Sequence, residues 1–151
     1  MRQPFQVLIH PVRIDGTKWE YLLLRRIASR GGFWQGITGG VEGDESFMEA
    51  ATRELFEEAG IVPSKIEQIE YSYSFPMQDE WRSIYDAGVE NIVEHVFIAF
   101  VDGQKEPTIS WEHDKWNWCS YNQALELLTW PNNIEALKCC DSFLRAWLDI
   151  R

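Results

Sequence analysis

The chain has 151 residues, 45% of them hydrophobic and 25% charged, which is the composition of a globular protein that buries a core. Its formal net charge of −10 argues against nonspecific binding to nucleic acid or to anionic membranes. No stretch has the apolar length of a membrane span, the N-terminal segment lacks the apolar run of a signal peptide, and the three cysteines form no metal-type spacing. We therefore expect a single cytoplasmic domain over residues 1–151.

The apolar and turn residues predict strands interspersed with helices. Asp15 and Gly16 form a hairpin signal between the first two apolar runs. In chain order, strands are expected at residues 5–14, 18–27, 65–78, 91–101 and 116–120, with two short ones in the segments FWQ and ITGGV. Helices are expected at residues 46–60, 121–128 and 132–148. This order predicts a mixed α/β domain with helices on both faces of the sheet.

The helix expected between Ser46 and Gly60 has two distinct faces. Its apolar face consists of Phe47, Ala51, Leu55 and Ala59, and the neighbouring face consists of Glu54, Glu57 and Glu58. Like charges at this spacing repel one another. Hard divalent cations such as Mg²⁺ bind through carboxylate oxygens and would remove that repulsion. The three glutamates therefore suggest a metal site, although a solvated acidic face would have the same spacing.

A longer pattern surrounds these glutamates. The string GGVEGDESFMEAATRELFEEAGI matches G-x5-E-x7-R-E-(apolar)-x-E-E-x-G-(apolar) at Gly39, Glu45, Arg53, Glu54, Leu55, Glu57, Glu58, Gly60 and Ile61. This pattern resembles the Nudix box, the signature of the Nudix hydrolases. The resemblance implies the Nudix fold, an α/β/α sandwich with a mixed β-sheet. It also implies divalent-metal-dependent hydrolysis of a nucleoside diphosphate linked to another group, with Mg²⁺ as cofactor and Mn²⁺ as an alternative.

The resemblance also implies roles for residues of the box. Glu54, Glu57 and Glu58 correspond to the metal-binding carboxylates of the family. The expected catalytic group consists of Glu45, Arg53 and Glu57. In it, Arg53 orients the glutamates by ion pairing, and Glu45 helps to fix the box or a metal-bound water. Gly39 and Gly40 are expected to provide the backbone geometry at the substrate.

Glu94 is a further candidate outside the box. It interrupts the apolar strand NIVEHVFIAF, where a buried carboxylate is tolerated only with a partner. Many Nudix enzymes use a glutamate beyond the box as a metal ligand, and Glu94 is the best-placed residue for that role. An edge position facing water is the alternative. His95 points to the opposite face of the strand and is expected to be structural.

Segments outside the box narrow the resemblance. LLLRR, FWQGITGGVE and YDAGV are similar to the bacterial dihydroneopterin triphosphate pyrophosphohydrolases of folate biosynthesis, which release pyrophosphate and leave the monophosphate. Another Nudix substrate is the first alternative: a dinucleoside polyphosphate, a (deoxy)nucleoside triphosphate or the 5′ end of RNA. A non-catalytic nucleotide-sensing module is the second. A small nucleotide or pterin triphosphate is the expected partner, and a homodimer is compatible with the sequence.

Besides Gly39 and Gly40, four further residues are candidates for binding that substrate. Arg25, Arg26 and Arg82 are expected to hold the triphosphate because guanidinium groups match phosphate oxygens, with surface ion pairs as the alternative. Trp34 is expected either to stack on the ring or to close the core. The general base is not determined by the sequence, and Glu45, Glu57, Glu94 and Glu112 are all candidates.

Overall fold

The computed structural model describes residues 2–103 and 106–150, and it contains seven strands and three α-helices there. The strands are β1 (Arg2–Asp15), β2 (Lys18–Arg26), β3 (Trp34–Gln35), β4 (Ile37–Glu42), β5 (Lys65–Pro76), β6 (Asn91–Phe100) and β7 (His113–Cys119). The helices are α1 (Phe47–Ala59), α2 (Tyr121–Leu127) and α3 (Pro131–Ile150), with short 3₁₀ turns at Ala28–Arg30 and Asp79–Ile84. Every predicted element is present, and β7 begins three residues earlier than predicted because its pairing with β2 extends to His113.

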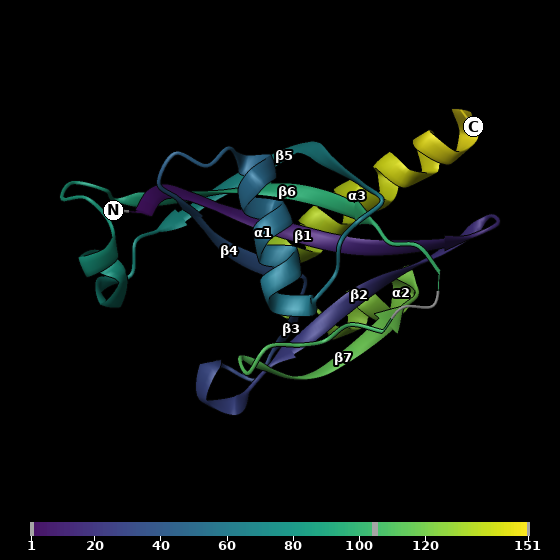
Figure 1. The fold of residues 1–151 in the computed structure, drawn as a ribbon, viewed down its shortest axis with the longest axis horizontal. Helices are drawn as coiled ribbons and strands as arrows, with labels where there is room; N and C mark the ends of the chain where they lie inside the picture. Colours follow the sequence, from purple (N-terminus) through teal and green to yellow (C-terminus); the bar gives the residue numbers. More distant parts are fainter. Residues whose placement is uncertain (1, 104–105, 151) are drawn as a thin grey trace.

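The sheet is mixed, and β1 is its centre (Figure 1). This strand has 14 residues, enough to pair with β4 through its first part and with β2 through its last part, both antiparallel. On its other side β1 pairs with β6 in parallel, and β6 pairs with β5. The order is β3-β2-β1-β6-β5, with β7 added to β2.

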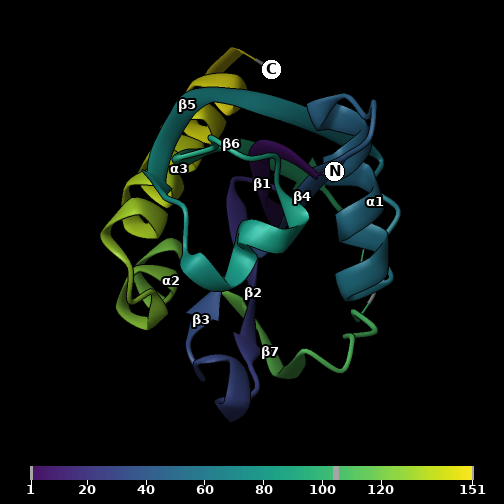
Figure 2. The same cartoon turned by 90° about the vertical axis from the view of Figure 1, so that its left-hand side faces the viewer.

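Alternation along the strands divides the core between two sheet faces. One face, here called the α1 face, packs against α1, and its buried side chains include Val7, Ile9, Leu22, Leu24 and Phe97. The other, here called the α3 face, packs against α2 and α3, and its buried side chains include Leu8, Val12, Leu23, Val96 and Ile98. Figure 2 shows the helices on opposite sides of the sheet. This arrangement confirms the predicted α/β/α sandwich with a mixed sheet.

Helix α1 has the ends that its sequence predicts. Ser46 and Glu49 form a reciprocal capping box, and Gly60 ends the helix in the left-handed conformation at φ 64°. Ala51 and Leu55 are fully buried against the sheet. The cap and the buried stripe together fix which side of α1 faces β4.

Two observations bear on the environment of the chain. Within residues 2–103 and 106–150, no helix combines the length and apolarity needed to cross a bilayer. Cys119, Cys139 and Cys140 are free thiols.

Candidate active site

Arg53 joins three of the predicted glutamates and connects α1 to β4. Its Nε and Nη2 donate to Glu45 Oε2 and Oε1 at 2.7 and 2.9 Å. Its Nη1 donates to Glu54 Oε1 at 2.9 Å and to Glu57 Oε2 at 3.2 Å. Nη2 also donates to the Gly40 carbonyl at 2.8 Å. Only a planar guanidinium can make these bonds at once, and its hydrogen bonds lower the pKa of Glu45.

Glu54 is the most enclosed of these carboxylates. It is buried between α1 and β4, with 8% of its surface exposed. A Cβ atom at Gly39 would overlap the Glu54 carboxylate, so the glycine leaves the space that this carboxylate fills. Burial raises the pKa of Glu54 to about 7, against the opposing effect of Arg53. A carboxylate held in this way is stabilised in its ionised form by an added cation.

Glu58 is held by the segment that precedes and begins β7. Ser110 Oγ donates to Glu58 Oε2 at 2.8 Å, and His113 Nδ1 lies 3.2 Å from the same oxygen. Burial raises the pKa of Glu58, but the imidazole and hydroxyl together outweigh it and the pKa is lowered overall. The sequence analysis missed Ser110. No local pattern could have revealed it, because the contact joins residues 52 positions apart.

The three candidate arginines occupy different environments. Arg25 makes two hydrogen bonds with Asp114, at 2.9 and 2.7 Å, and Arg82 pairs with Asp79 at 3.3 Å. Arg26 interacts electrostatically with Glu58, and burial lowers its pKa. Within the described part of the chain, its Nε has no hydrogen-bond partner. Arg26 is therefore the arginine of the three that combines a buried donor without a partner and an interaction with an α1 glutamate.

Glu112 lies near Arg26 in a cationic part of the same region. Its carboxylate interacts electrostatically with Arg26 and lies 4.0 Å from Arg30 Nη2. The preceding residue, Trp111, is 71% exposed, with the Arg30 guanidinium 5.4 Å from its ring centroid. Of the four candidate bases, Glu45 and Glu57 share Arg53, and Glu112 lies beside Arg26.

Glu94 lies on the other side of the sheet. Val96 and Ile98 share its face by alternation and pack on α3, whereas His95 stacks on Phe47 of α1 with ring centroids 4.1 Å apart. The structure therefore does not bring Glu94 together with the α1 glutamates. Trp34 also packs against the α3-face cluster.

The α1 glutamates suit a hard divalent cation by chemistry. Within residues 2–103 and 106–150, no three acidic, histidine or cysteine side chains converge on one metal position. Arg53 holds Glu54 and Glu57 through one nitrogen, whereas Ser110 and His113 hold Glu58. These side chains all supply carboxylate oxygens, and the buried Glu54 carboxylate fits into the space left by Gly39. The donor set thus fits Mg²⁺ or Mn²⁺ once the side chains turn toward a shared ion.

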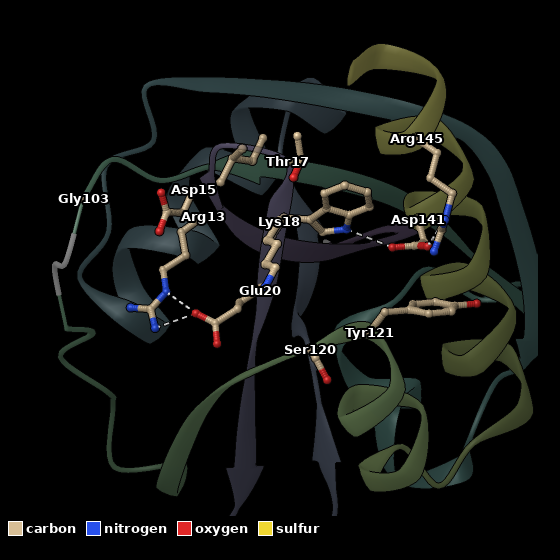
Figure 3. Close-up of a pocket in the computed structure, with 12 residues that line it drawn as sticks. Arg13, Asp15, Thr17, Lys18, Glu20, Gly103, Ser120, Tyr121, Asp141 and Arg145 are labelled. Atoms are coloured by element: carbon tan, nitrogen blue, oxygen red, sulfur yellow. Dashed lines mark hydrogen bonds and ion pairs between the residues drawn. The ribbon is translucent and has the colours of Figure 1, made fainter. Parts of the chain in front are cut away.

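A separate pocket of about 810 Å³ lies between the β1–β2 hairpin, the start of α2 and the second half of α3 (Figure 3). Its buried residue Asp141 accepts hydrogen bonds from Trp19 Nε1, Tyr21 Oη and Arg145 Nε at 2.9, 2.6 and 2.8 Å. None of the predicted site residues lines this pocket. The hydrogen bonds of Asp141 to Trp19 and Tyr21 fix α3 against the hairpin and β2.

Comparison with known proteins identifies the family. The model of the NUDIX domain matches residues 6–139. The chain is 33% identical over 133 residues to an octanoyltransferase of Myxococcus xanthus, covering 87% of this chain and 35% of the relative. It is 33% identical over 110 residues to the dihydroneopterin triphosphate diphosphatase of Haemophilus influenzae, covering 70% and 69%. The chain thus spans about a third of the length of the first relative and about two thirds of the second.

A solved structure agrees with these matches. The dihydroneopterin triphosphate pyrophosphohydrolase of E. coli has a TM-score of 0.74 at 25% identity, over 91% of this chain and 94% of that one. The chain belongs to the Nudix hydrolase family, as its sequence predicts. Within that family it resembles enzymes named for acting on a pterin triphosphate.

Proposed function

We propose that this chain hydrolyses a phosphoanhydride bond of dihydroneopterin triphosphate, releasing pyrophosphate and leaving the monophosphate. The proposed cofactor is Mg²⁺, with Mn²⁺ as an alternative. The observation that carries the proposal is the binding of Glu45, Glu54 and Glu57 by the single guanidinium of Arg53. The similarity to the Haemophilus influenzae and E. coli enzymes supports the choice of substrate. The free thiols are compatible with the proposed cytoplasmic location.

The proposed roles follow from the position of each side chain. Glu54, Glu57 and Glu58 would hold the divalent ion, which when bound supplies charge neutralisation for the phosphate oxygens. Arg53 fixes the rotamers of two of these glutamates and of Glu45. Arg26, whose buried Nε has no hydrogen-bond partner among the described residues, would turn its guanidinium to donate to a phosphate oxygen.

The attacking water needs a base that can accept its proton. Glu112 is proposed for this role because its carboxylate lies beside Arg26, where a bound phosphate would be. Glu45 and Glu57 are less suited because their oxygens already accept hydrogen bonds from Arg53. Once the base has taken its proton, the water attacks phosphorus in line with the scissile bond, and pyrophosphate leaves from the opposite side.

The test is a phosphate-release assay with dihydroneopterin triphosphate, the nucleoside triphosphates and diadenosine tetraphosphate. Each is measured with Mg²⁺, with Mn²⁺ and with a chelator. We expect metal-dependent turnover that is at least about tenfold faster, as kcat/KM, on the pterin than on the others, or about 1.4 kcal/mol in transition-state terms. A tenfold preference for another substrate would overturn the choice of substrate.

Glu57→Gln and Glu126→Gln form a matched pair for the catalytic roles. Glu57 is hydrogen-bonded to Arg53, whereas Glu126 is an exposed residue of α2. We expect turnover to fall by at least about a hundredfold in the first variant and to stay unchanged in the second. Substrate binding without turnover in the unaltered chain would instead indicate the nucleotide-sensing module.

A further inference from the structure

Glu94 is a buried carboxylate that the proposed chemistry does not use. It is 3% exposed and lies on the α3 face of β6. Its Oε2 accepts a hydrogen bond from Gln6 Nε2 at 2.6 Å, and its Oε1 accepts one from the Tyr73 hydroxyl. A carboxylate has about four acceptor positions, two on each oxygen. Each oxygen of Glu94 therefore retains the capacity to accept one more hydrogen bond.

Asn133 adds another unused acceptor to this cluster. It lies near the start of α3, is 6% exposed, and donates from Nδ2 to the Tyr73 hydroxyl at 3.4 Å. Among the described residues, nothing donates to its Oδ1. A buried acceptor without a donor is unfavourable, and such groups are rare unless a ligand or water satisfies them. Asn133 Oδ1 therefore offers an acceptor position that no donor of the described residues fills.

We propose that Glu94 and Asn133 bind the ring of the substrate through a 2-amino-4-oxopyrimidine edge, the edge that pterins and guanine share. The Glu94 carboxylate accepts one hydrogen from the 2-amino group and one from the adjacent ring N–H. Asn133 Oδ1 accepts a further N–H of the ring system. Adenine offers no such pair, because its ring nitrogen at that edge is an acceptor. This inference rests on the proposed function and specifies which substrate ring the site selects.

The position of Glu94 relative to the α1 glutamates suits a triphosphate ester. Gln6 lies beside Glu94 on β1, and Gly40 of β4 lies opposite Gln6. Two strand spacings, about 10 Å, therefore separate Glu94 from Gly40, which is a distance that a triphosphate chain spans. Gly40 and its neighbour Gly39 contact Arg53 and Glu54, respectively. Among the described strands β4 pairs with β1 alone, so a ring on the α3 face can place its phosphates at the α1 glutamates by passing round the other edge of β4.

Trp34 is the other candidate for contact with the ring. It packs with the α3-face cluster, the face that carries Glu94. The sequence analysis expected this tryptophan either to stack on the ring or to close the core. Its packing in that cluster favours the second of these roles, so the ring contacts are assigned to Glu94 and Asn133.

The kinetic test compares dihydroneopterin triphosphate, GTP, ITP and ATP. ITP is GTP without the 2-amino group but with the same ring N–H, so the GTP and ITP pair isolates the 2-amino contact, and ATP lacks both contacts assigned to Glu94. In the unaltered chain we expect kcat/KM for the preferred 2-amino substrate to exceed that for ITP and ATP by about a hundredfold or more. Glu94→Gln should remove most of that preference, lower ITP hydrolysis less than that of the preferred substrate because ITP offers only the ring N–H, and change ATP hydrolysis by less than about threefold. Whether dihydroneopterin triphosphate or GTP is preferred distinguishes a pterin from a guanine ring.

Matched variants separate recognition from folding and from metal binding. Glu70→Gln changes an exposed carboxylate on β5 in the same way and should leave all four rates unchanged. Asn133→Leu removes the unused Oδ1 acceptor together with the long Nδ2 bond to the Tyr73 hydroxyl, so it should weaken the preferred substrate while it lowers the thermal midpoint only slightly. An equal loss on all four substrates in Glu94→Gln, or a raised Mg²⁺ requirement, would overturn the inference and return Glu94 to a metal or structural role.

A binding measurement keeps the inference testable if no substrate is hydrolysed. Neopterin, which carries no phosphate, is titrated by its fluorescence into the metal-free chain. Guanosine is titrated in parallel by calorimetry. We expect at least one to bind the unaltered chain and to bind Glu94→Gln at least about tenfold more weakly. Equal affinity in both proteins, or no binding of either compound, would overturn the ring site. Binding without any hydrolysis would overturn the proposed function alone.

Discussion

The carboxylate of Glu54 occupies the space that a side chain at Gly39 would fill. The glycine is therefore part of the site, because its missing Cβ lets α1 bring a buried carboxylate against β4. Burial of that carboxylate is unfavourable without a nearby cation. The absence of a side chain at Gly39 in β4 is thus a condition for the position of Glu54, which is one of the metal ligands proposed on α1.

Replacement of Gly39 by alanine should displace the Glu54 carboxylate. We expect Gly39→Ala to lower metal-dependent kcat/KM by about tenfold to a hundredfold and stability by about 1–3 kcal/mol through overpacking. Gly16→Ala is the control, since Gly16 has φ 63° at the hairpin and an added Cβ there meets nothing within 4 Å. That variant should lose stability by strain and keep its activity. Full activity in Gly39→Ala would show that Glu54 is not needed where it lies.

Arg53→Lys should disorganise the glutamates while it retains the positive charge. An ammonium cannot reproduce the fork that binds both Glu45 oxygens and reaches Glu54, so we expect kcat/KM to fall by about a hundredfold. Arg13→Lys alters a similar pair, Arg13 with Glu20 on the hairpin, and should leave kinetics unchanged. Steady-state kinetics with Mg²⁺ decide the outcome. A loss of less than threefold in Arg53→Lys would mean that charge alone orients the carboxylates.

Glu54 should give the metal-free protein a pH-dependent stability. Its pKa is about 7 when folded, against an ordinary value of 4.5, so the folded chain keeps a proton that the unfolded chain releases. Its contribution to stability is therefore complete below about pH 4.5 and is lost as pH rises through about 7. The lowered pKa of Glu45 acts in the opposite direction and at lower pH, outside this window.

Urea unfolding of the unaltered chain and of Glu54→Gln measures this effect. The difference between their free energies of unfolding should shift against the unaltered chain as pH rises from about 5 to about 7.5. The raised pKa of Glu94 is common to both proteins and cancels. Mg²⁺ binds the ionised form of the carboxylate, so it should raise the thermal midpoint more at pH 8 than at pH 6. A pH-independent difference would show that Glu54 titrates normally.

Asp141 should matter for stability and not for catalysis. Asp141→Ala leaves the Tyr21 hydroxyl without its acceptor and Trp19 Nε1 with only its longer bond to Tyr21 Oη at 3.2 Å, at a cost of about 2–5 kcal/mol. Tyr21→Phe removes the hydroxyl itself, so no buried donor is left without an acceptor, and the variant should lose only about 1 kcal/mol of stability. Denaturant titration gives both values, and kcat/KM should stay within about twofold in folded protein. Loss of activity without loss of stability would give the pocket of Figure 3 a functional role.

Local chemistry made much of this fold and site predictable. The capping box at Ser46, the stop at Gly60 and the i, i+4 apolar stripe define α1 through interactions within one segment. Arg53 lies one residue before Glu54 and four before Glu57 on that helix, so helical spacing alone makes those contacts possible. The residues that the family pattern selects are therefore largely the residues that one helix can bring together.

Contacts between segments were decided only by the tertiary structure. The sequence by itself determined that Glu94 and His95 point to opposite faces, because strand side chains alternate with a period of two. It did not determine which face α1 covers, since that depends on the pairing of β6 with β1 and on the packing of three helices. Glu94 consequently lies beside Tyr73 and Gln6, away from the α1 glutamates, and Ser110 reaches Glu58 from a loop. Helical geometry depends on neighbouring residues and could be predicted from the sequence. The side of the sheet on which each side chain meets its partner depends on how all the strands and helices pack.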